Sequence, residues 1–373
     1  MRIGRPRRHA RKFLEQLGQP EARLRIMTPS SGADVQGAVR PTTIAEIARL
    51  AGVSPPTVSK VLNGRTTVAA ETRAHVQKVL HEHGYRSTRK APKLFPILEL
   101  VFHQLAGIHP VEILKGVQRI AAEQDLAVVV SESQGRQTPG RGWLEGVLSR
   151  RPTGVIPVFS DLSAEQRAQL AGAGIPLVVL DPNGVPNDEV PSVGSTNWIG
   201  GLSATRHLLE LGHRRIAVIT GPKWALSSRA RLDGYRAALD AAGVPVDPAL
   251  IREGTFEIAD GLTHTNELLR LADPPTAIFA FNDGMAIGVY HAVSQADLRV
   301  PRDLSVVGFD DYQPLDQWLV PPLTTVRQPL SEMGAAAARM ALDLAQGTVP
   351  QPRRLELATE LVVRASTAAP ARR

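Results

Sequence analysis

A pair of short helical patterns joined by a glycine constrains the fold of this 373-residue chain more than any other feature. Apolar residues recur between Ile44 and Ala51 at the spacing of one helix face. Thr43 and Glu46 have the spacing of a capping box at its start. Gly52 ends this helix, because glycine adopts the left-handed conformation of a helix end at little cost. The pattern predicts a short amphipathic helix that turns sharply into the next element.

A second helix is predicted directly after this turn. Ser54 can cap it, and Pro55 suits its first position, where no backbone N–H is needed. It ends at residues 63–64, and a third helix is expected over residues 70–83. Together they form a helix-turn-helix unit, whose second helix fits the DNA major groove. An ordinary three-helix mini-domain is the alternative, but the polar outer face of the second helix favours DNA binding.

The charge of the chain is unevenly distributed along its length. Residues 1–93 hold 18 basic and 6 acidic side chains, a local charge of +12, whereas the remaining residues carry a local charge of −5. A basic head suggests that it meets a polyanion, and a solubilising tail is the plain alternative. We expect residues 1–41 to form a disordered basic extension, unless translation starts later, for instance at Met27.

After residue 95 short apolar runs alternate with helical patterns. Alternating β and α elements imply parallel sheets covered by helices on both faces. About 270 residues are too many for one such sheet, so two lobes with a ligand cleft between them are expected. The predicted strands cover residues 96–102, 126–131, 153–158, 176–180, 215–220, 276–281 and 305–309, and the predicted helices cover residues 111–123, 143–149, 164–171, 198–211, 229–242 and 284–296.

Composition excludes several classes of protein and site. The chain has no cysteine, so disulfides, cysteine zinc sites and thiol nucleophiles are excluded. No apolar run approaches the roughly 18 residues of a membrane-spanning helix, and no secretory signal is recognisable, so we expect a cytoplasmic protein. No dinucleotide, phosphate-loop or zinc-protease motif is present, and Asp310-Asp311 is only a weak metal signal. We therefore expect neither an enzyme nor a cofactor.

The run from Thr43 to Asn63 resembles the DNA-binding head of the lactose-repressor (LacI/GalR) family, and residues 68–85 extend the match. The body is similar to the same family at landmarks that follow in order. These are residues 211–222, 229–235, 281–288, 303–311 and 321–328.

The resemblance implies an α/β fold with an N-terminal three-helix helix-turn-helix domain and a two-lobed, type I periplasmic-binding-protein-like core. It also implies three crossover segments and a homodimer. The expected divisions are a DNA-binding domain at 42–86, a linker or hinge at 87–95 and a core at 96–367. The first lobe comprises about 96–193 and 328–354, and the second about 194–326 and 355–367.

The family pattern also implies which residues meet DNA. Pro55, Pro56 and Lys60 occupy the base-reading positions. The two prolines depart from the usual pattern, since they offer only apolar contact, and Pro55 is equally explained as a helix start. Specificity should therefore depend on Lys60, which can donate to guanine. The residues implied to contact phosphates or fix register are Thr43, Thr57, Ser59, Asn63 and Thr67.

The expected hinge is a second departure from the family pattern. The family usually has a segment here that forms a small helix on the operator and inserts a leucine into the minor groove. This chain has a shorter run, and Pro92 would disrupt a helix interior. Leu94 is a weak candidate for the inserted side chain. The basic residues that can still follow phosphates are Arg86, Arg89, Lys90 and Lys93.

Six residues map onto the family's effector-binding positions, and three of them follow a predicted strand. They are Asp181, Ser227, Arg231, Asn282, Asp310 and Gln328. Charged and amide groups at strand ends suit a polyhydroxylated ligand such as a sugar, usually with a ring against its apolar face. The candidate rings are Phe102, Trp224 and Trp318, and His103 and His109 lie in a nearby loop. A structural ion pair between Arg231 and Asp310 is the alternative.

These expectations combine into one functional hypothesis. The chain is a repressor of carbohydrate-utilisation genes, which binds a pseudo-palindromic double-stranded DNA operator as a homodimer. A small effector in the cleft, a sugar, controls its affinity for the operator. A sugar-binding module with an unrelated head and a hydrolase on the same two-lobed core are the alternatives.

Overall fold

The computed structural model describes residues 43–62, 68–83, 95–105, 107–134, 137–183, 190–313 and 318–371. The expected basic extension therefore lies outside the described residues. So do Asn63, Thr67 and the linker up to residue 94, including the candidate hinge residues Arg86, Arg89, Lys90, Lys93 and Leu94.

The head consists of three helices, α1 (Ile44–Leu50), α2 (Pro55–Leu62) and α3 (Ala70–Glu82). The hydroxyl of Thr43 accepts a hydrogen bond from the Glu46 backbone N–H at 3.3 Å, and Gly52 has φ +63°. The Ser54 hydroxyl caps α2 by accepting from the Thr57 N–H at 3.3 Å. A small apolar core holds the three helices together, with members Ile47, Val58 and Val76 fully buried. The helix-turn-helix prediction is confirmed.

The first lobe is built on a six-stranded sheet with the order β11-β5-β4-β3-β1-β2. Its strands pair in parallel throughout. Their bounds are β1 (Phe95–Phe102), β2 (Ala127–Glu132), β3 (Pro152–Val158), β4 (Val179–Leu180), β5 (Ser192–Ser195) and β11 (Arg354–Leu357). The helices of this lobe are α4 (His109–Glu123), α5 (Arg141–Arg150), α6 (Ala164–Gly172) and α12 (Leu330–Ala345).

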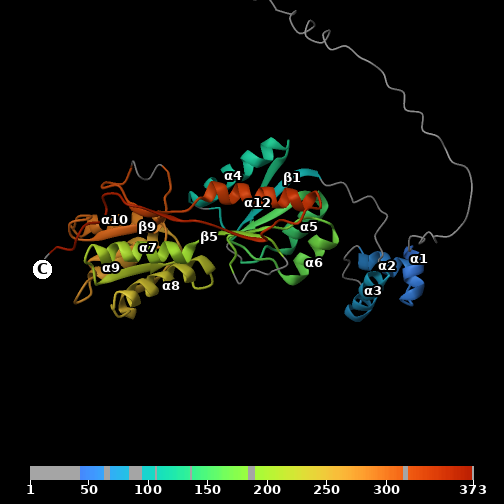
Figure 1. Ribbon diagram of the computed structural model, residues 1–373, viewed down its shortest axis with the longest axis horizontal. Coiled ribbons are helices and arrows are strands. Elements are labelled where there is room, and N and C mark those ends of the chain that lie inside the picture. The colour runs from blue at the N-terminus through green and yellow to red at the C-terminus, as the bar shows by residue number, and fades with distance from the viewer. Residues whose placement is uncertain are drawn as a thin grey trace, which may run out of the picture. The chain divides into compact units, whose positions relative to one another are not determined.

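The second lobe repeats this plan with the strand order β12-β10-β9-β8-β6-β7. All its pairs are parallel except β10 with β12, which is antiparallel. The strands are β6 (Ile216–Thr220), β7 (Ile251–Glu253), β8 (Ala277–Ala280), β9 (Ser305–Asp310), β10 (Thr324–Arg327) and β12 (Glu360–Val362). Figure 1 shows α7 (Asn197–Glu210), α8 (Leu226–Ala241), α9 (Ile258–Leu269) and α10 (Asp283–Gln295) around this sheet.

Each lobe has its own apolar core, because its parallel strands are covered on both faces. In the second lobe Phe279, Phe281 and Phe309 are fully buried between the sheet and its helices. In the first lobe α12 packs against α4, and the two helix backbones approach closely at Gly116. A Cβ at Gly116 would lie 1.8 Å from the Ser331 carbonyl oxygen, so only glycine permits this approach.

The chain passes between the lobes three times, at β5–α7, β10–α12 and β11–β12. Our expectation that residues 355–367 belong to the second lobe was wrong in part. The chain forms two short strands there: β11 pairs with β5 of the first sheet, and β12 pairs with β10 of the second. β5 also continues to Ser195, past the expected border at 193. A strand's own residues do not reveal its partner, because pairing depends on which edge the folded sheet offers.

No helix in the described part of the chain is long and apolar enough to cross a membrane.

Candidate DNA-binding surface and effector cavity

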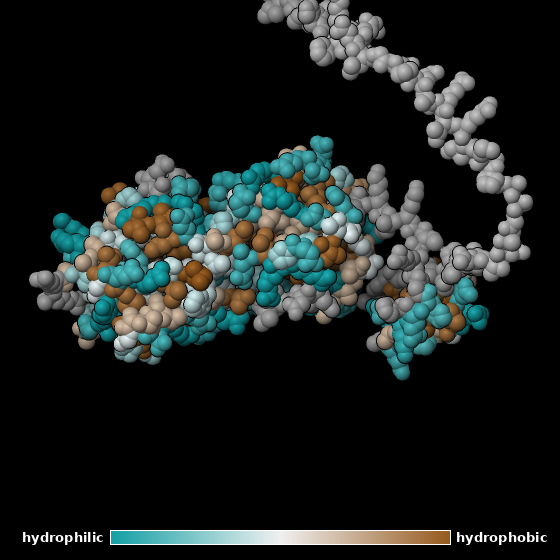
Figure 2. Space-filling view, in the orientation of Figure 1, coloured by the Kyte–Doolittle hydropathy of each residue, from teal (hydrophilic) through white to brown (hydrophobic). Residues whose placement is uncertain are grey.

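The outer face of α2 is exposed at the positions expected to meet DNA. Pro55, Pro56 and Lys60 are exposed, whereas Val58 on the opposite face is fully buried. In the space-filling view the visible surface of the head is mainly hydrophilic, with some apolar atoms between (Figure 2). A cation on a rigid helix with an apolar inner face has the form of a recognition helix.

Two of the expected phosphate contacts also have a local structural role. Thr43 caps α1, and the Thr57 hydroxyl lies 2.8 Å from the Ser54 hydroxyl at the start of α2. Ser59 is half-buried on the same helix. The hydroxyls of Thr43 and Thr57 thus act at helix starts, and any phosphate contact would be added to that role.

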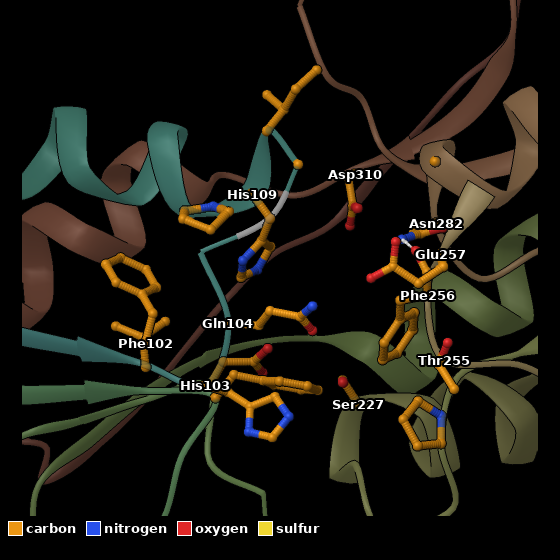
Figure 3. Close-up of a pocket in the computed structure, with 18 of the residues that line it drawn as sticks. Phe102, His103, Gln104, His109, Ser227, Thr255, Phe256, Glu257, Asn282 and Asp310 are labelled. Atoms are coloured by element: carbon orange, nitrogen blue, oxygen red, sulfur yellow. Dashed lines mark hydrogen bonds between the residues drawn. The ribbon is translucent and has the colours of Figure 1, made fainter. Parts of the chain in front are cut away.

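A cavity of about 560 Å³ lies between the two lobes. All six residues expected at the effector site line it, although they are spread over some 150 positions of the chain. Asp181 follows β4 and Gln328 follows β10, whereas Asn282 and Asp310 lie at the ends of β8 and β9. Ser227 and Arg231 come from the first turns of α8. Figure 3 shows Asp310, Asn282 and Glu257 on one side of the cavity and Phe102 and His103 on the other.

Arg231 is 3% exposed and is held on several sides. Its Nε donates to Asn197 Oδ1 at 2.8 Å, and its Nη1 donates to the Phe281 carbonyl. Its guanidinium also lies over the Phe309 ring, 3.6 Å from the centroid. Arg231 and Asp310 do not form the structural ion pair considered as an alternative. In the described structure no guanidinium nitrogen of Arg231 lies within 4.0 Å of an Asp310 carboxylate oxygen. The guanidinium is therefore fixed in place for use in the cavity.

Gln328 connects the cavity to the crossovers between the lobes. Its Nε2 donates to Asp310 Oδ1 at 2.6 Å, and its Oε1 accepts from the Ser195 hydroxyl at 2.6 Å. Ser195 ends β5, so one amide joins two crossover segments to a carboxylate of the cavity. A change in the position of Asp310 would thus reach these crossover segments directly.

The buried carboxylates of the cavity are harder to ionise than free ones. Burial raises the pKa of Asp181 to about 6, against the opposing effect of Arg231. Burial also raises the pKa of Asp310, although Arg231 and the hydrogen bonds from Tyr312 and Gln328 oppose the shift. Behind them, burial and the charge of Asp310 raise the pKa of Asp283, whose oxygens accept from Thr325 and the Tyr312 N–H.

Both the oxygen and the nitrogen of the Asn282 side-chain amide already have hydrogen-bond partners within the protein. Its Oδ1 caps α10 by accepting from the Met285 N–H at 2.7 Å, and its Nδ2 donates to the Phe256 carbonyl at 2.9 Å. It still lines the cavity, but it has less freedom for a ligand than the sequence suggested.

Four rings form a cluster along the cavity that the sequence revealed only in part. Trp224 lies 5.0 Å from the His103 ring and 5.2 Å from the Phe159 ring, and Phe159 lies 5.9 Å from Phe256. His103 and Phe159 belong to the first lobe, whereas Trp224 and Phe256 belong to the second. The cluster therefore joins the lobes across the cleft.

The other candidate rings divide between the cavity and the surface. Phe102 and Trp224 line the cavity, as does His109, whose pKa is lowered to about 4 by burial and by Arg231. Trp318 is 71% exposed and is not among the lining residues, so its selection as a ring for the ligand was wrong. Phe159, Phe256 and Tyr312 were missed, since each is an isolated aromatic in a loop with no pattern around it.

Several cavity residues have strained backbones. Asp181 has φ +50°, Asp310 has φ +114°, Phe159 has φ +50° and Phe256 has φ +71°. Non-glycine residues are uncommon at positive φ, and such residues concentrate at functional sites. Four of the nine described non-glycine residues at positive φ thus line the cavity.

Family models match both parts of the chain. Residues 43–87 match bacterial regulatory proteins of the lacI family, and residues 205–367 match a periplasmic binding protein-like domain.

Among curated relatives, the ribose operon repressor of Escherichia coli (strain K12) is 33% identical over 87% of this chain and 99% of its own length. Among solved structures, a transcriptional regulator CelR–cellobiose complex is 33% identical, covers 87% of this chain and 99% of its own, and has a TM-score of 0.67. A lac repressor dimer bound to operator and the anti-inducer ONPF is 29% identical, covers 88% and 100%, and has a TM-score of 0.63. With both architectural parts and nearly full-length relatives matched, the chain belongs to the LacI family of bacterial transcriptional regulators.

Proposed function

We propose that this regulator is a repressor of carbohydrate-utilisation genes whose affinity for a pseudo-palindromic operator is controlled by a sugar. The observation that carries the proposal is the convergence of six distant polar residues on one interlobe cavity beside a wall of rings. Fixed donors and acceptors with an aromatic face suit a polyhydroxylated ring. Relatives whose names mention ribose and cellobiose support this ligand class.

The proposed mechanism is a population shift in a homodimer. Two heads at one spacing fit two half-sites of the operator, and closure of the cleft on an effector changes that spacing. An effector that prefers one state by about 1–3 kcal/mol would change operator affinity by roughly 5- to 150-fold. The dimeric, operator-bound lac repressor supports this arrangement.

Operator recognition can be tested with Lys60→Ala. We expect this variant to lose most of its preference for the operator over random DNA, by roughly 5- to 150-fold, because a good base contact contributes about 1–3 kcal/mol. Lys78→Ala on α3 is the matched control, since Lys78 is exposed and only weakly paired with Glu82. Fluorescence anisotropy at fixed salt measures both variants. Equal selectivity in the wild type and Lys60→Ala would refute the assignment.

The effector site can be tested with Arg231→Ala and Asp310→Asn. Both should abolish release or enhancement of operator binding by the sugar while leaving sugar-free operator binding intact. Asp310→Asn keeps the shape of the side chain, so it tests the site even where Arg231→Ala perturbs folding. A normal sugar response in both variants would show that the cavity is not the effector site. Product analysis after incubation separates binding from turnover.

A further inference from the structure

The charges that face the cavity are unequal in number. Among the described residues three carboxylates line it, those of Asp181, Glu257 and Asp310, and Asp283 lies directly behind. Among the described lining residues Arg231 is the one arginine, and no lysine is included. Figure 3 shows Glu257 beside Asn282, on the same side of the cavity as Asp310. The cavity is therefore lined by more negative than positive side chains.

The single guanidinium is poorly placed to offset this excess. Binding a phosphate in two-pronged fashion requires two parallel N–H groups of an arginine. Nε of Arg231 already donates to Asn197, and Nη1 donates to the Phe281 carbonyl. Its face is covered by the Phe309 ring, 3.6 Å away. These contacts fix the guanidinium in place and leave only its remaining Nη1 and Nη2 hydrogens for a ligand.

The imidazoles and the helix N-termini do not reverse this balance. His109 stays neutral at physiological pH, because burial and Arg231 lower its pKa to about 4. The helices α4 and α8 begin at the cavity without a side-chain cap, and each N-terminus contributes about half a positive charge. The N-terminus of α10 is already occupied by Asn282 and followed by Asp283. The three carboxylates that line the described part of the cavity still outnumber its one arginine.

We propose that the cavity is a charge filter: its effector is an uncharged polyhydroxylated ring, and Glu257 is a specificity-determining residue that rejects phosphorylated sugars. This inference rests on the proposed function and narrows its ligand class. The aromatic wall supports it, since the rings of Trp224 and Phe159 offer an apolar surface to a sugar and nothing to a phosphate. A phosphate would bring a like charge against the buried carboxylates of Asp181 and Asp310 and the exposed carboxylate of Glu257, which is unfavourable.

The experiment compares neutral and phosphorylated members of matched pairs on the full-length protein. The probes are ribose with ribose 5-phosphate, glucose with glucose 6-phosphate, and cellobiose with cellobiose 6-phosphate, measured by isothermal titration calorimetry at pH 7.5. We expect the neutral member of the pair that binds to be favoured by about 100-fold or more. A phosphorylated member that binds as tightly as its neutral partner would overturn the charge filter, while the proposed sugar regulation would stand.

The role of Glu257 is tested by Glu257→Gln in the same titrations. We expect the preference for the neutral sugar over its phosphorylated partner to fall by about tenfold, because one like charge is removed from the cavity. Glu123→Gln is the matched control, because Glu123 is an exposed carboxylate at the far end of α4. An unchanged preference in Glu257→Gln would overturn its assignment. If no neutral probe binds and none alters operator binding, the proposed function fails together with the filter.

Discussion

At the residue scale, the cavity contains carboxyl groups whose ionisation is unfavourable because they are buried. A free aspartate ionises well below neutral pH, whereas burial raises the pKa of Asp181 to about 6. The folded protein therefore holds a proton on Asp181 over a pH range in which the unfolded chain has lost it. Because folding then binds a proton, stability must fall as the pH rises through this range.

We predict that this effect is visible in Asp181→Asn. Between about pH 4 and pH 6 the free energy of unfolding of the wild type, relative to the variant, should fall by about 3 kcal/mol and then stay constant. Urea unfolding at several pH values measures the difference. Asp125→Asn, which removes an exposed carboxylate away from the cavity, is the matched control. A pH-independent difference for Asp181→Asn would refute the raised pKa.

At the scale of elements, a glycine contact sets the position of Arg231. The helices α7 and α8 pack closely, and a Cβ at Gly201 would lie 2.3 Å from the Arg231 carbonyl oxygen. Any larger side chain must push α8 away from α7. Since α8 carries both Ser227 and Arg231, the packing of two helices determines the geometry of the cavity.

Gly201→Ala should therefore destabilise the protein by about 1–3 kcal/mol, the usual cost of overpacking. It should also weaken effector binding through the displacement of Arg231. Urea unfolding and sugar titration measure the two effects. In Gly172→Ala, at the end of α6, the added Cβ meets no atom within 4 Å, so this control should be neutral or slightly stabilising. A fully stable Gly201→Ala would contradict the close packing.

Elements with strong local patterns were predictable from the sequence. The three head helices, and strands such as β1 and β6 with the helices beside them, formed close to the expected bounds. β4 covers only Val179–Leu180 of the predicted residues 176–180, because few of these residues pair with a neighbouring strand. β7, α9 and α12 were not predicted. The strand has only three residues, and the helices contain many small or polar residues that blur the apolar periodicity.

At the scale of the whole molecule, the aromatic cluster is the contact that depends on both lobes at once. Phe159 and Trp224 approach to 5.2 Å across the cleft. Such a pair contributes about 0.5–1.5 kcal/mol beyond the burial of its area. Because the two rings belong to different lobes, this contact should favour the arrangement that brings the lobes together and retention of the effector.

A double-mutant cycle on effector affinity tests this prediction. Phe159→Ala and Trp224→Ala should show a coupling energy of about 0.5–1.5 kcal/mol, because each removes the same contact. Phe159→Ala combined with Trp318→Ala is the control cycle, since Trp318 is 71% exposed and not among the lining residues of the cavity. Its coupling should be close to zero. Equal coupling in both cycles would show that the rings do not act across the cleft.

The sequence by itself determined the helix-turn-helix head, the alternation of strands and helices and, through its family resemblance, the six polar residues of the cavity. These follow from local periodicity, caps and short motifs, which are legible along the chain. Only the tertiary structure decided which lobe each short crossover strand joins, which rings meet across the cleft and how burial shifts the pKa of Asp181. Those properties depend on distances between residues far apart in the chain, and no local pattern encodes such distances.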